Sequence, residues 1–164
     1  MSITVRRAAP DDAAAISTVW AVVCAERVYT AVEQPFSPDQ ERAYLEALSD
    51  REAIFVAEDG GDVVGFQSLD RWADYTDSFA HVGVIGTIVH PEWRRRGVGR
   101  RLAARTFAFA RAHGYEKLVI YVRAGNEGAR AFYRRLGFRP KGVLERQVKI
   151  DGRYEDEVFM EHFL

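Results

Sequence analysis

The residues from Arg94 to Gly99 form an arginine- and glycine-rich turn between an apolar segment and a helical pattern. The unpaired N–H groups at a helix N-terminus carry about half a positive charge, so they attract phosphate oxygens. Gly97 and Gly99 lack a Cβ, which lets a ligand lie against the main chain. The order Arg-x-x-Gly-x-Gly lacks the ending of a Walker phosphate loop and is not a Rossmann fingerprint. The turn therefore predicts a site for a phosphorylated ligand.

A second polar residue, Asn126, precedes a helical pattern about thirty residues after that turn. Asparagine is a favoured N-cap, because its side-chain oxygen accepts a hydrogen bond from the first turn of the helix. The apolar positions of this pattern follow helical spacing, and Gly137 is placed to end the helix in a left-handed conformation. They are Ala129, Phe132, Tyr133 and Leu136.

The elements that position these residues follow from hydrophobic periodicity and turn signals. Ser37-Pro38-Asp39-Gln40 has the capping-box pattern of a helix start, and Asp151-Gly152 is typical of a hairpin turn. The order is strand, two helices, three strands, helix, strand, helix and two strands. It predicts an α/β fold with a mixed, mostly antiparallel central sheet and helices on both faces. The expected strands are 3–7, 53–58, 63–69, 81–89 and 117–123 and two in the C-terminal segment, and helices are expected from near residues 10, 37, 98 and 126.

The bulk composition limits the classes of function. The chain has 164 residues, 23 basic and 24 acidic, with a formal net charge of −1, so a single domain spanning 1–164 is expected without a nucleic-acid or membrane partner. No secretion signal or long apolar run is present, so a cytoplasmic protein is expected. The one cysteine, Cys24, reads as a buried core thiol rather than a nucleophile, and no metal site is expected.

Three segments occur together: Arg94-x-x-Gly97-x-Gly99, Asn126-x-x-Ala129-x-x-Phe132-Tyr133 and Leu136-Gly137-Phe138. In these segments, in its opening strand and in its element order, the chain resembles the GNAT family of acetyl-CoA-dependent N-acetyltransferases. The resemblance implies that acetyl-CoA is the phosphorylated ligand and that the turn holds its pyrophosphate. It also implies that the main chain of the preceding strand pairs with the pantetheine arm, with a β-bulge opening the gap. The cofactor-binding residues implied are Ile88, Val89, Arg94, Arg95, Arg96, Gly97, Val98, Gly99, Arg100 and Asn126.

Tyr133 matches the family tyrosine that protonates the departing thiolate, so the resemblance implies that it is catalytic. A phenol near pKa 10 protonates a thiolate near 8.5 uphill by about 2 kcal/mol. The proton therefore passes late or through water unless the site shifts those values. The alternative is a half-buried core tyrosine that packs beside Phe132 and Leu136.

An amine acceptor must lose a proton before it attacks, because a free alkylamine near pKa 10 is mostly protonated at pH 7. Several GNAT enzymes use a glutamate on the strand before the glycine turn, but residues 81–89 contain no acid here. His81 has suitable chemistry but lies at the far end of that strand. A water relay to a distant carboxylate is the alternative, so the general base is left open.

Aromatic residues alternate with carboxylates between Asp70 and Phe79, which would suit an ammonium group. The alternative is a solvated loop. The candidate acceptor residues are Tyr29, Phe36, Trp72, Asp74, Tyr75 and His81. The C-terminal Tyr154 to Glu157 is a candidate for the pocket, a homodimer contact or an exposed strand.

The expected function is acetyl transfer to a primary amine of a small molecule, such as an amino acid, polyamine or antibiotic, by direct attack in a ternary complex. A ping-pong route through Cys24 is the mechanistic alternative. Within the enzyme class the other acceptor is a protein N-terminus or lysine. From another class, the alternative is a non-catalytic acyl-CoA-binding sensor.

Overall fold

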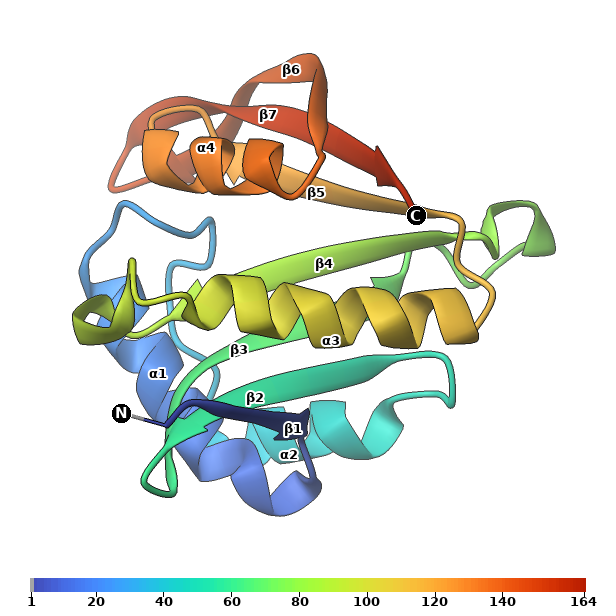
Figure 1. Ribbon diagram of the computed structural model, residues 1–164. Coiled ribbons are helices and arrows are strands. Elements are labelled where there is room, and N and C mark those ends of the chain that lie inside the picture. The colour runs from blue at the N-terminus through green and yellow to red at the C-terminus, as the bar shows by residue number, and fades with distance from the viewer. Residues whose placement is uncertain (1) are drawn as a thin grey trace.

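The computed structural model describes residues 2–164, in which seven strands form one sheet in the order β1-β2-β3-β4-β5-β7-β6 (Figure 1). Neighbouring strands are antiparallel except β4 and β5, which are parallel. The predicted mixed, mostly antiparallel sheet is thus confirmed. The strands are β1 Thr4–Arg7, β2 Ala53–Asp59, β3 Asp62–Arg71, β4 Val82–Val89, β5 Lys117–Arg123, β6 Arg139–Ile150 and β7 Arg153–Phe163.

Helices cover both faces of the sheet. In Figure 1, α3 (Val98–Ala112) and α4 (Glu127–Arg135) lie in front, with α1 (Ala13–Ala25) and α2 (Pro38–Ala47) behind. The expected apolar face of α1 is fully buried, at Ile16, Val19 and Val23, where it packs on Phe66 and Ile88 of β3 and β4. Short 3-10 helices occupy Pro10–Asp12 (η1), Asp77–Phe79 (η2) and Pro91–Trp93 (η3). No helix within residues 2–164 is both long and apolar enough to cross a membrane.

Local signals set the ends of the helices. The Gln40 N–H donates to Ser37 Oγ (3.2 Å) and the Ser37 N–H donates to Gln40 Oε1 (2.8 Å), so the predicted capping box starts α2. Gly114 after α3 and Gly137 after α4 have φ values of +82° and +101°. Such values suit glycine, which ends a helix in the left-handed region.

The strands β4 and β5 stay paired over a short stretch only. Their register runs from Val82 opposite Lys117 to Val84 opposite Val119 and then stops, although both strands continue. In Figure 1 the two strands diverge beyond this point, towards the end of β4 that leads into α3. The sheet is thereby split into two halves with a gap between β4 and β5.

The predicted β-bulge in β4 is wrong. The pairing of β3 with β4 runs from Gly65 opposite Val89 to Arg71 opposite Gly83 without a register shift. The gap forms instead because β4 stays with β3, while β5 pairs with β7 along its whole length. The two halves of the sheet follow different partners, so no extra residue is needed to part them.

Candidate active site

The main chain of β4 presents hydrogen-bonding groups to the gap. The N–H of His90 donates to Val64 O (2.9 Å) and that of Trp72 to Val82 O (3.1 Å), which identifies the even residues of β4 as those bonded to β3. Along a strand, the backbone N–H and C=O groups of successive residues point to opposite sides. Those of the odd residues Thr87 and Val89 therefore face β5. Those of Ile88 face β3, and its side chain is buried in the α1 cluster. An extended ligand in the gap would therefore pair with Thr87 and Val89.

The turn before α3 has the backbone of an anion site. Hydrogen bonding of the helix begins at the Arg101 N–H, which donates to Gly97 O (3.1 Å), so the N–H groups of the first helical turn remain for a ligand. Gly97 has φ +81°, and a Cβ built on it meets no atom within 4 Å. Arg95 also has a positive φ, +60°. Successive N–H groups in such conformations form a concavity that binds anions.

At Gly99, close packing against a neighbouring helix favours glycine. A Cβ at this position would lie 2.9 Å from the Phe132 ring. Gly99 therefore allows α3 to approach α4. A larger residue at Gly99 would therefore displace Phe132, whereas the space beside Gly97 is open. Ligand access at the two glycines stays a prediction.

The side chain of Arg94 is engaged by the protein itself. Its guanidinium donates to the two carboxylate oxygens of Glu26 (2.9 and 2.5 Å) and to Val89 O (3.3 Å). The same group lies 4.1 Å from the centre of the Tyr29 ring. Arg94 thus fixes the loop after α1 against the gap. The side chains of Arg95 and Arg100 are exposed, and the Arg96 guanidinium lies 5.2 Å from the centre of the Trp93 ring.

Tyr133 reaches across the gap to β4. Its hydroxyl donates to Thr87 Oγ1 (2.7 Å), which also accepts a hydrogen bond from Gln67 Nε2 (2.7 Å). Gln67 is completely buried, and its Oε1 has no partner. Sequence reasoning missed Thr87 and Gln67. The available signal was a hydroxyl and an amide in strands otherwise made mainly of apolar residues and glycine.

Burial raises the pKa of Tyr133 to about 12, because water is excluded from the phenolate, although hydrogen bonding with Thr87 lowers it. The pKa of Tyr133 then exceeds that of a thiol, 8.5, by about 3.5, so proton transfer to the thiolate is uphill by about 5 kcal/mol. Protonation of a fully formed thiolate by Tyr133 is more unfavourable than the unperturbed values predict. A neutral hydroxyl is nevertheless held ready to donate a hydrogen bond.

Asn126 caps α4 as predicted. Its Oδ1 accepts a hydrogen bond from the Ala129 N–H (3.1 Å), and its Nδ2 donates to Tyr29 O (3.5 Å). The side chain is buried between the start of α4 and the loop after α1. It therefore ties two walls of the gap together.

We expect Asn126→Ala to lower the free energy of unfolding by about 1 kcal/mol, because the cap hydrogen bond is lost. Asn126→Ser keeps a capping oxygen but is too short to reach Tyr29. Urea denaturation followed by circular dichroism would compare the two. Equal losses for serine and alanine would show that the cap is not the stabilising contact.

The candidate acceptor residues are divided among three places. Tyr29 lies over Arg94, and Phe36 makes an edge contact with Trp20 at 5.5 Å. Trp72 stacks on Tyr121 of β5 at 6.1 Å, at the narrow end of the gap. Asp74 and Tyr75 are exposed in the β3–β4 loop, and the Tyr75 ring contacts that of Phe79, with their centres 6.2 Å apart.

His81 is remote from Tyr133. It precedes β4, where its carbonyl accepts a hydrogen bond from the Lys117 N–H (3.1 Å) at the closed end of the gap. Six residues of strand separate it from Thr87, or about 20 Å. The structure therefore does not bring His81 and Tyr133 together.

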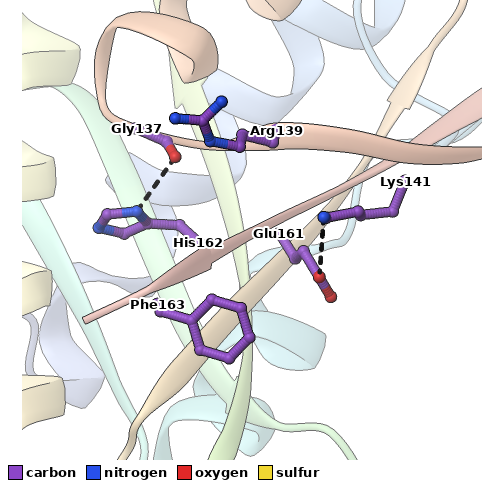
Figure 2. Close-up of a pocket in the computed structure, with 6 residues that line it drawn as sticks. All are labelled: Gly137, Arg139, Lys141, Glu161, His162 and Phe163. Carbon is purple, nitrogen blue, oxygen red and sulfur yellow. Dashed lines mark hydrogen bonds and ion pairs between the residues drawn. The ribbon is translucent and has the colours of Figure 1, made fainter.

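Two hollows lie away from the predicted phosphate turn. The smaller one is on the outer side of β6 and β7 (Figure 2) and contains none of the predicted site residues; its lining is Gly137, Arg139, Lys141, Glu161, His162 and Phe163. The larger, of about 650 Å³, lies where the loop after α1 meets the β6–β7 turn, and includes Arg27, Arg123 and Asp151. Arg27 bonds Asp151 at 2.7 Å there. Residues 2–164 contain no cluster of His, Cys, Asp or Glu that could hold a metal.

Comparison with known proteins connects this geometry to a family. The family model described as "Acetyltransferase (GNAT) family" matches residues 21–138. The L-amino acid N-acyltransferase MnaT of Escherichia coli is 27% identical over 162 residues, which cover 97% of this chain and 92% of that protein. The N-alpha-acetyltransferase RimI of Mycobacterium tuberculosis is 35% identical over 98 residues, 58% of each chain.

Solved structures show the same arrangement. YncA of Salmonella typhimurium, solved with its cofactor acetyl-CoA, superposes with a TM-score of 0.91 at 25% identity, over 100% of this chain and 95% of that one. The gap beside β4 and the glycine turn at α3 suit the two ends of such a cofactor. The family resemblance and the cofactor expected from the sequence are confirmed. The chain belongs to the acetyltransferase (GNAT) family and is an N-acyltransferase that uses acetyl-CoA.

Proposed function

We propose that this protein acetylates the primary amine of a small, amino-acid-like molecule. The observation that carries the proposal is the gap between β4 and β5, where the main chain of Thr87 and Val89 is free of β3 and the Tyr133 hydroxyl contacts Thr87 Oγ1. The names of relatives support the acceptor class, since MnaT is an L-amino acid N-acyltransferase. A relative from Pseudomonas aeruginosa, 31% identical over 114 residues, acts on L-methionine sulfoximine and L-methionine sulfone.

On the donor side, the N–H groups of the turn from Gly97 to Arg100 would hold the pyrophosphate, with Arg95, Arg96 and Arg100 adding positive charge. The side of β4 carrying Thr87 and Val89 would pair with the pantetheine arm, and Asn126 would keep the opposite wall in place. Bound acetyl-CoA supplies the acetyl group and a thiolate leaving group. The chain itself orients that thioester beside Tyr133.

Attack is proposed to be direct. Cys24 is 3% exposed, and burial raises the pKa of its thiol, which suppresses the nucleophilic thiolate. Tyr133 would stabilise the developing negative charge on sulfur by donating a hydrogen bond, because full proton transfer is uphill. Its hydroxyl, which donates to Thr87 Oγ1, would turn about the Cζ–O bond to donate to the sulfur instead.

Because the pKa of Tyr133 is about 12, its neutral form persists up to that pH. Ionisation of a tyrosine near pKa 10 would instead remove the donor from pH 10 upward. We expect kcat, measured with saturating amine and acetyl-CoA, to show no fall assignable to Tyr133 between pH 8 and 10. A limb near pH 10 that disappears in Tyr133→Phe would contradict this assignment.

A panel of acceptors tests the function. Four amines represent the alternatives: L-methionine sulfone, L-phenylalanine, spermidine and a peptide with a free alanine N-terminus. Release of the coenzyme A thiol from acetyl-CoA is followed with each. Turnover of a free amino acid at least about tenfold faster than of the peptide would support the proposal. Preference for the peptide would favour the RimI-like alternative, and no amine-dependent release would favour an acyl-CoA sensor.

Two further expectations stay proposals. A cytoplasmic location is one of them. The other is a homodimer through the outer strand β6, where Val143 and Leu144 are exposed. Light scattering of the purified protein would measure the oligomeric state.

A further inference from the structure

The acid that β4 lacks is present on the neighbouring strand. We propose that Asp70 of β3, oriented by Tyr44 of α2, takes the proton from the ammonium group of the acceptor. The inference rests on the proposed function, since it concerns the amine that the function requires. It replaces the two bases left open by the sequence, His81 and a distant carboxylate reached through water.

The sheet register places Asp70 at the narrow end of the gap. Asp70 lies directly opposite Val84 of β4, and Val84 lies opposite Val119 in the last residue pair that joins β4 to β5. Side chains of directly opposed residues share a face, with Cβ atoms about 5 Å apart. The Asp70 carboxylate therefore lies on the same face of the sheet as Val84, one strand further from the gap. It is level with the residue pair at which β4 and β5 begin to part.

The face on which Asp70 lies is the one opposite Tyr133. Side chains alternate along β3, so Asp70 shares a face with Phe66, which packs against α1 and α2. Thr87, which bonds Tyr133, is an odd residue of β4 and points to the other face, towards α4. Asp70 and Tyr133 thus approach the gap from opposite faces of the sheet. An amine could attack from one face while the sulfur departs on the other.

Aromatic side chains extend the Asp70 site across the gap. Trp72 follows two residues after Asp70 on the same face, and its ring stacks on Tyr121 (6.1 Å) and meets Phe159 (6.3 Å). The ring centres of Tyr121 and Phe159 are themselves 5.3 Å apart, so rings from β5 and β7 and that of Trp72, which follows β3, form a continuous wall. An ammonium group is attracted by ring faces and by a carboxylate. The wall and Asp70 supply both.

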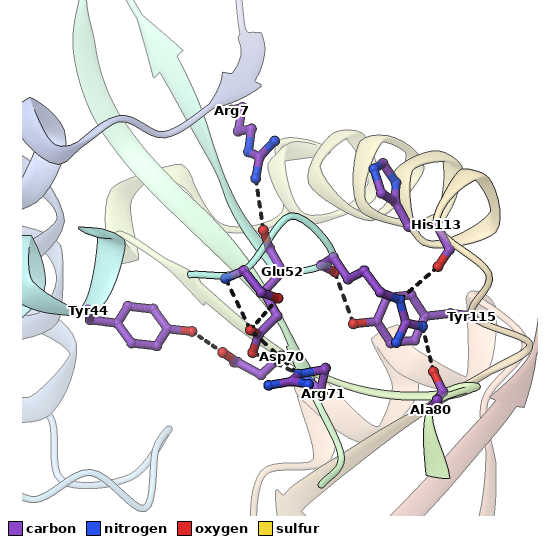
Figure 3. A network of polar contacts seen from close by, with 10 residues as sticks. Arg7, Tyr44, Glu52, Asp70, Arg71, Ala80, His113 and Tyr115 are labelled. Carbon is purple, nitrogen blue, oxygen red and sulfur yellow. Dashed lines mark hydrogen bonds and ion pairs between the residues drawn. The ribbon is translucent and has the colours of Figure 1, made fainter. Parts of the chain in front are cut away.

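The environment of Asp70 suits a base. The Tyr44 hydroxyl donates a hydrogen bond to its carboxylate (Figure 3). Burial raises the pKa of Asp70; the Tyr44 hydrogen bond lowers it, the negative charge of Glu52 raises it and a hydrogen bond from Ser68 lowers it. A carboxylate with a raised pKa accepts a proton more readily near neutral pH.

The other charged and titratable groups of this network come from several elements. Glu52 accepts hydrogen bonds from Ser49 and from the Arg71 N–H, and its carboxylate lies 3.8 Å from the Arg71 side chain. Glu41 adds negative charge near Tyr44 from within α2. On the other side, Tyr115 interacts electrostatically with Asp70 and stacks under Arg51 at 4.4 Å. Among the described acids of this network, Asp70 accepts the hydrogen bond from Tyr44 and lies on the strand next to β4.

The acceptor R–NH3⁺ gives one proton to the Asp70 carboxylate, and the neutral nitrogen forms a bond to the thioester carbonyl carbon. The C–S bond breaks with its electron pair going to sulfur. A second proton leaves the nitrogen as the amide forms and is transferred, through water, to the sulfur. Asp70 returns its proton to solvent, so the net products are the acetylated amine, the free thiol and one H⁺.

The competing acid is Glu157 of β7. It is 8% exposed and lies opposite Arg123 in the sheet, on the wide side of the gap. Burial raises its pKa, whereas the positive charge of Arg123 lowers it. The experiment therefore includes both acids.

Asp70→Asn is the decisive variant, because asparagine keeps the size of the side chain and removes the base. With the panel amine that the wild type acetylates fastest, we expect kcat/KM at pH 7 to fall at least about a hundredfold. The loss should shrink about tenfold for each pH unit as the amine deprotonates by itself towards pH 10. Acetyl-CoA affinity by calorimetry should stay within twofold. Asp62→Asn, an exposed acid at the other end of β3, is the matched control and should retain wild-type activity.

In a plot of kcat/KM against pH, protonation of Asp70 causes a fall at low pH, called here the acidic limb. Substitution of two neighbours of Asp70 should shift this limb in opposite directions. Tyr44→Phe removes a hydrogen bond that favours the carboxylate, so the pKa of Asp70 rises and the limb moves to higher pH. Glu52→Gln removes a like charge, so the limb moves to lower pH. A purely structural role for Asp70 would not produce opposite shifts. Thermal unfolding of each variant establishes that it is folded.

The activities of the wild type and of these variants decide whether Asp70 is the base, whether Glu157 is, and whether the proposed function holds. Wild-type activity in folded Asp70→Asn overturns the inference and leaves the acetyltransferase function intact. The inference is also overturned if Glu157→Gln loses the low-pH fall in kcat/KM while Asp70→Asn keeps it. That result would assign the base to Glu157. A wild-type protein that binds acetyl-CoA but acetylates none of the four amines overturns the proposed function, and the role of Asp70 with it.

Discussion

Tyr133→Phe is expected to lower kcat by about a hundredfold or more and to change the dissociation constant of acetyl-CoA by less than twofold. The phenyl ring keeps its packing against Phe138 in the core, so the wall of the gap is retained. In the proposed function the lost hydroxyl is the donor to the departing sulfur, and removal of one such donor typically costs a hundredfold to a thousandfold. Because the interaction strengthens as charge develops, the loss falls on kcat rather than on binding.

Steady-state kinetics and calorimetry on the same preparations measure this split. Tyr115→Phe is the matched control, because Tyr115 is also buried and its hydroxyl donates to a backbone carbonyl, Arg51 O at 2.9 Å, outside the gap. It should keep wild-type kcat while losing similar stability. An unchanged kcat in Tyr133→Phe would remove Tyr133 from the chemistry and leave it as a core residue.

Gly97→Val is expected to weaken acetyl-CoA binding by at least about tenfold, which corresponds to about 1.4 kcal/mol. At φ +81° a residue with a Cβ is strained by about 1–2 kcal/mol, and a β-branched one more, so the turn shifts. The new side chain also enters the open space in front of the first N–H groups of α3, where a pyrophosphate would lie. Both effects disturb the cradle rather than the core.

Gly114→Val at the other end of α3 separates these effects. Gly114 has nearly the same φ, +82°, and a Cβ there likewise meets nothing within 4 Å, so its backbone strain is comparable. Calorimetry should show weakened coenzyme A binding for Gly97→Val alone, while thermal unfolding shows similar destabilisation for both. Equal affinity in the two folded variants would contradict the assignment of the turn to phosphate.

Elements governed by local chemistry were predictable from the sequence. The capping box at Ser37, the N-cap at Asn126 and the hairpin turn at Asp151 each depend on a few adjacent residues and appear as expected. The resemblance in the glycine turn and the Asn126 helix predicted the family. These signals sit within short stretches, where side-chain type and backbone conformation are directly linked.

The features of the site that the sequence did not predict depend on contacts between residues far apart in the chain. Arg94 pairs with Glu26, 68 positions away, and nothing near Arg94 distinguishes this use from phosphate binding. Gly99 is explained by Phe132 on another helix. Likewise, Asp70 becomes a base candidate through the register that puts it opposite Val84. A single sequence contains no periodicity that specifies such pairings.

The fate of a labelled acetyl group tests the central claim, direct transfer from acetyl-CoA to an amine in one complex. Protein is incubated with [acetyl-¹⁴C]acetyl-CoA, first alone and then with the preferred panel amine. The structure predicts no label on the protein at either stage and rapid, amine-dependent appearance of label in the acetylated amine. Label bound covalently to the protein, or label that stays on coenzyme A with every amine, would contradict it.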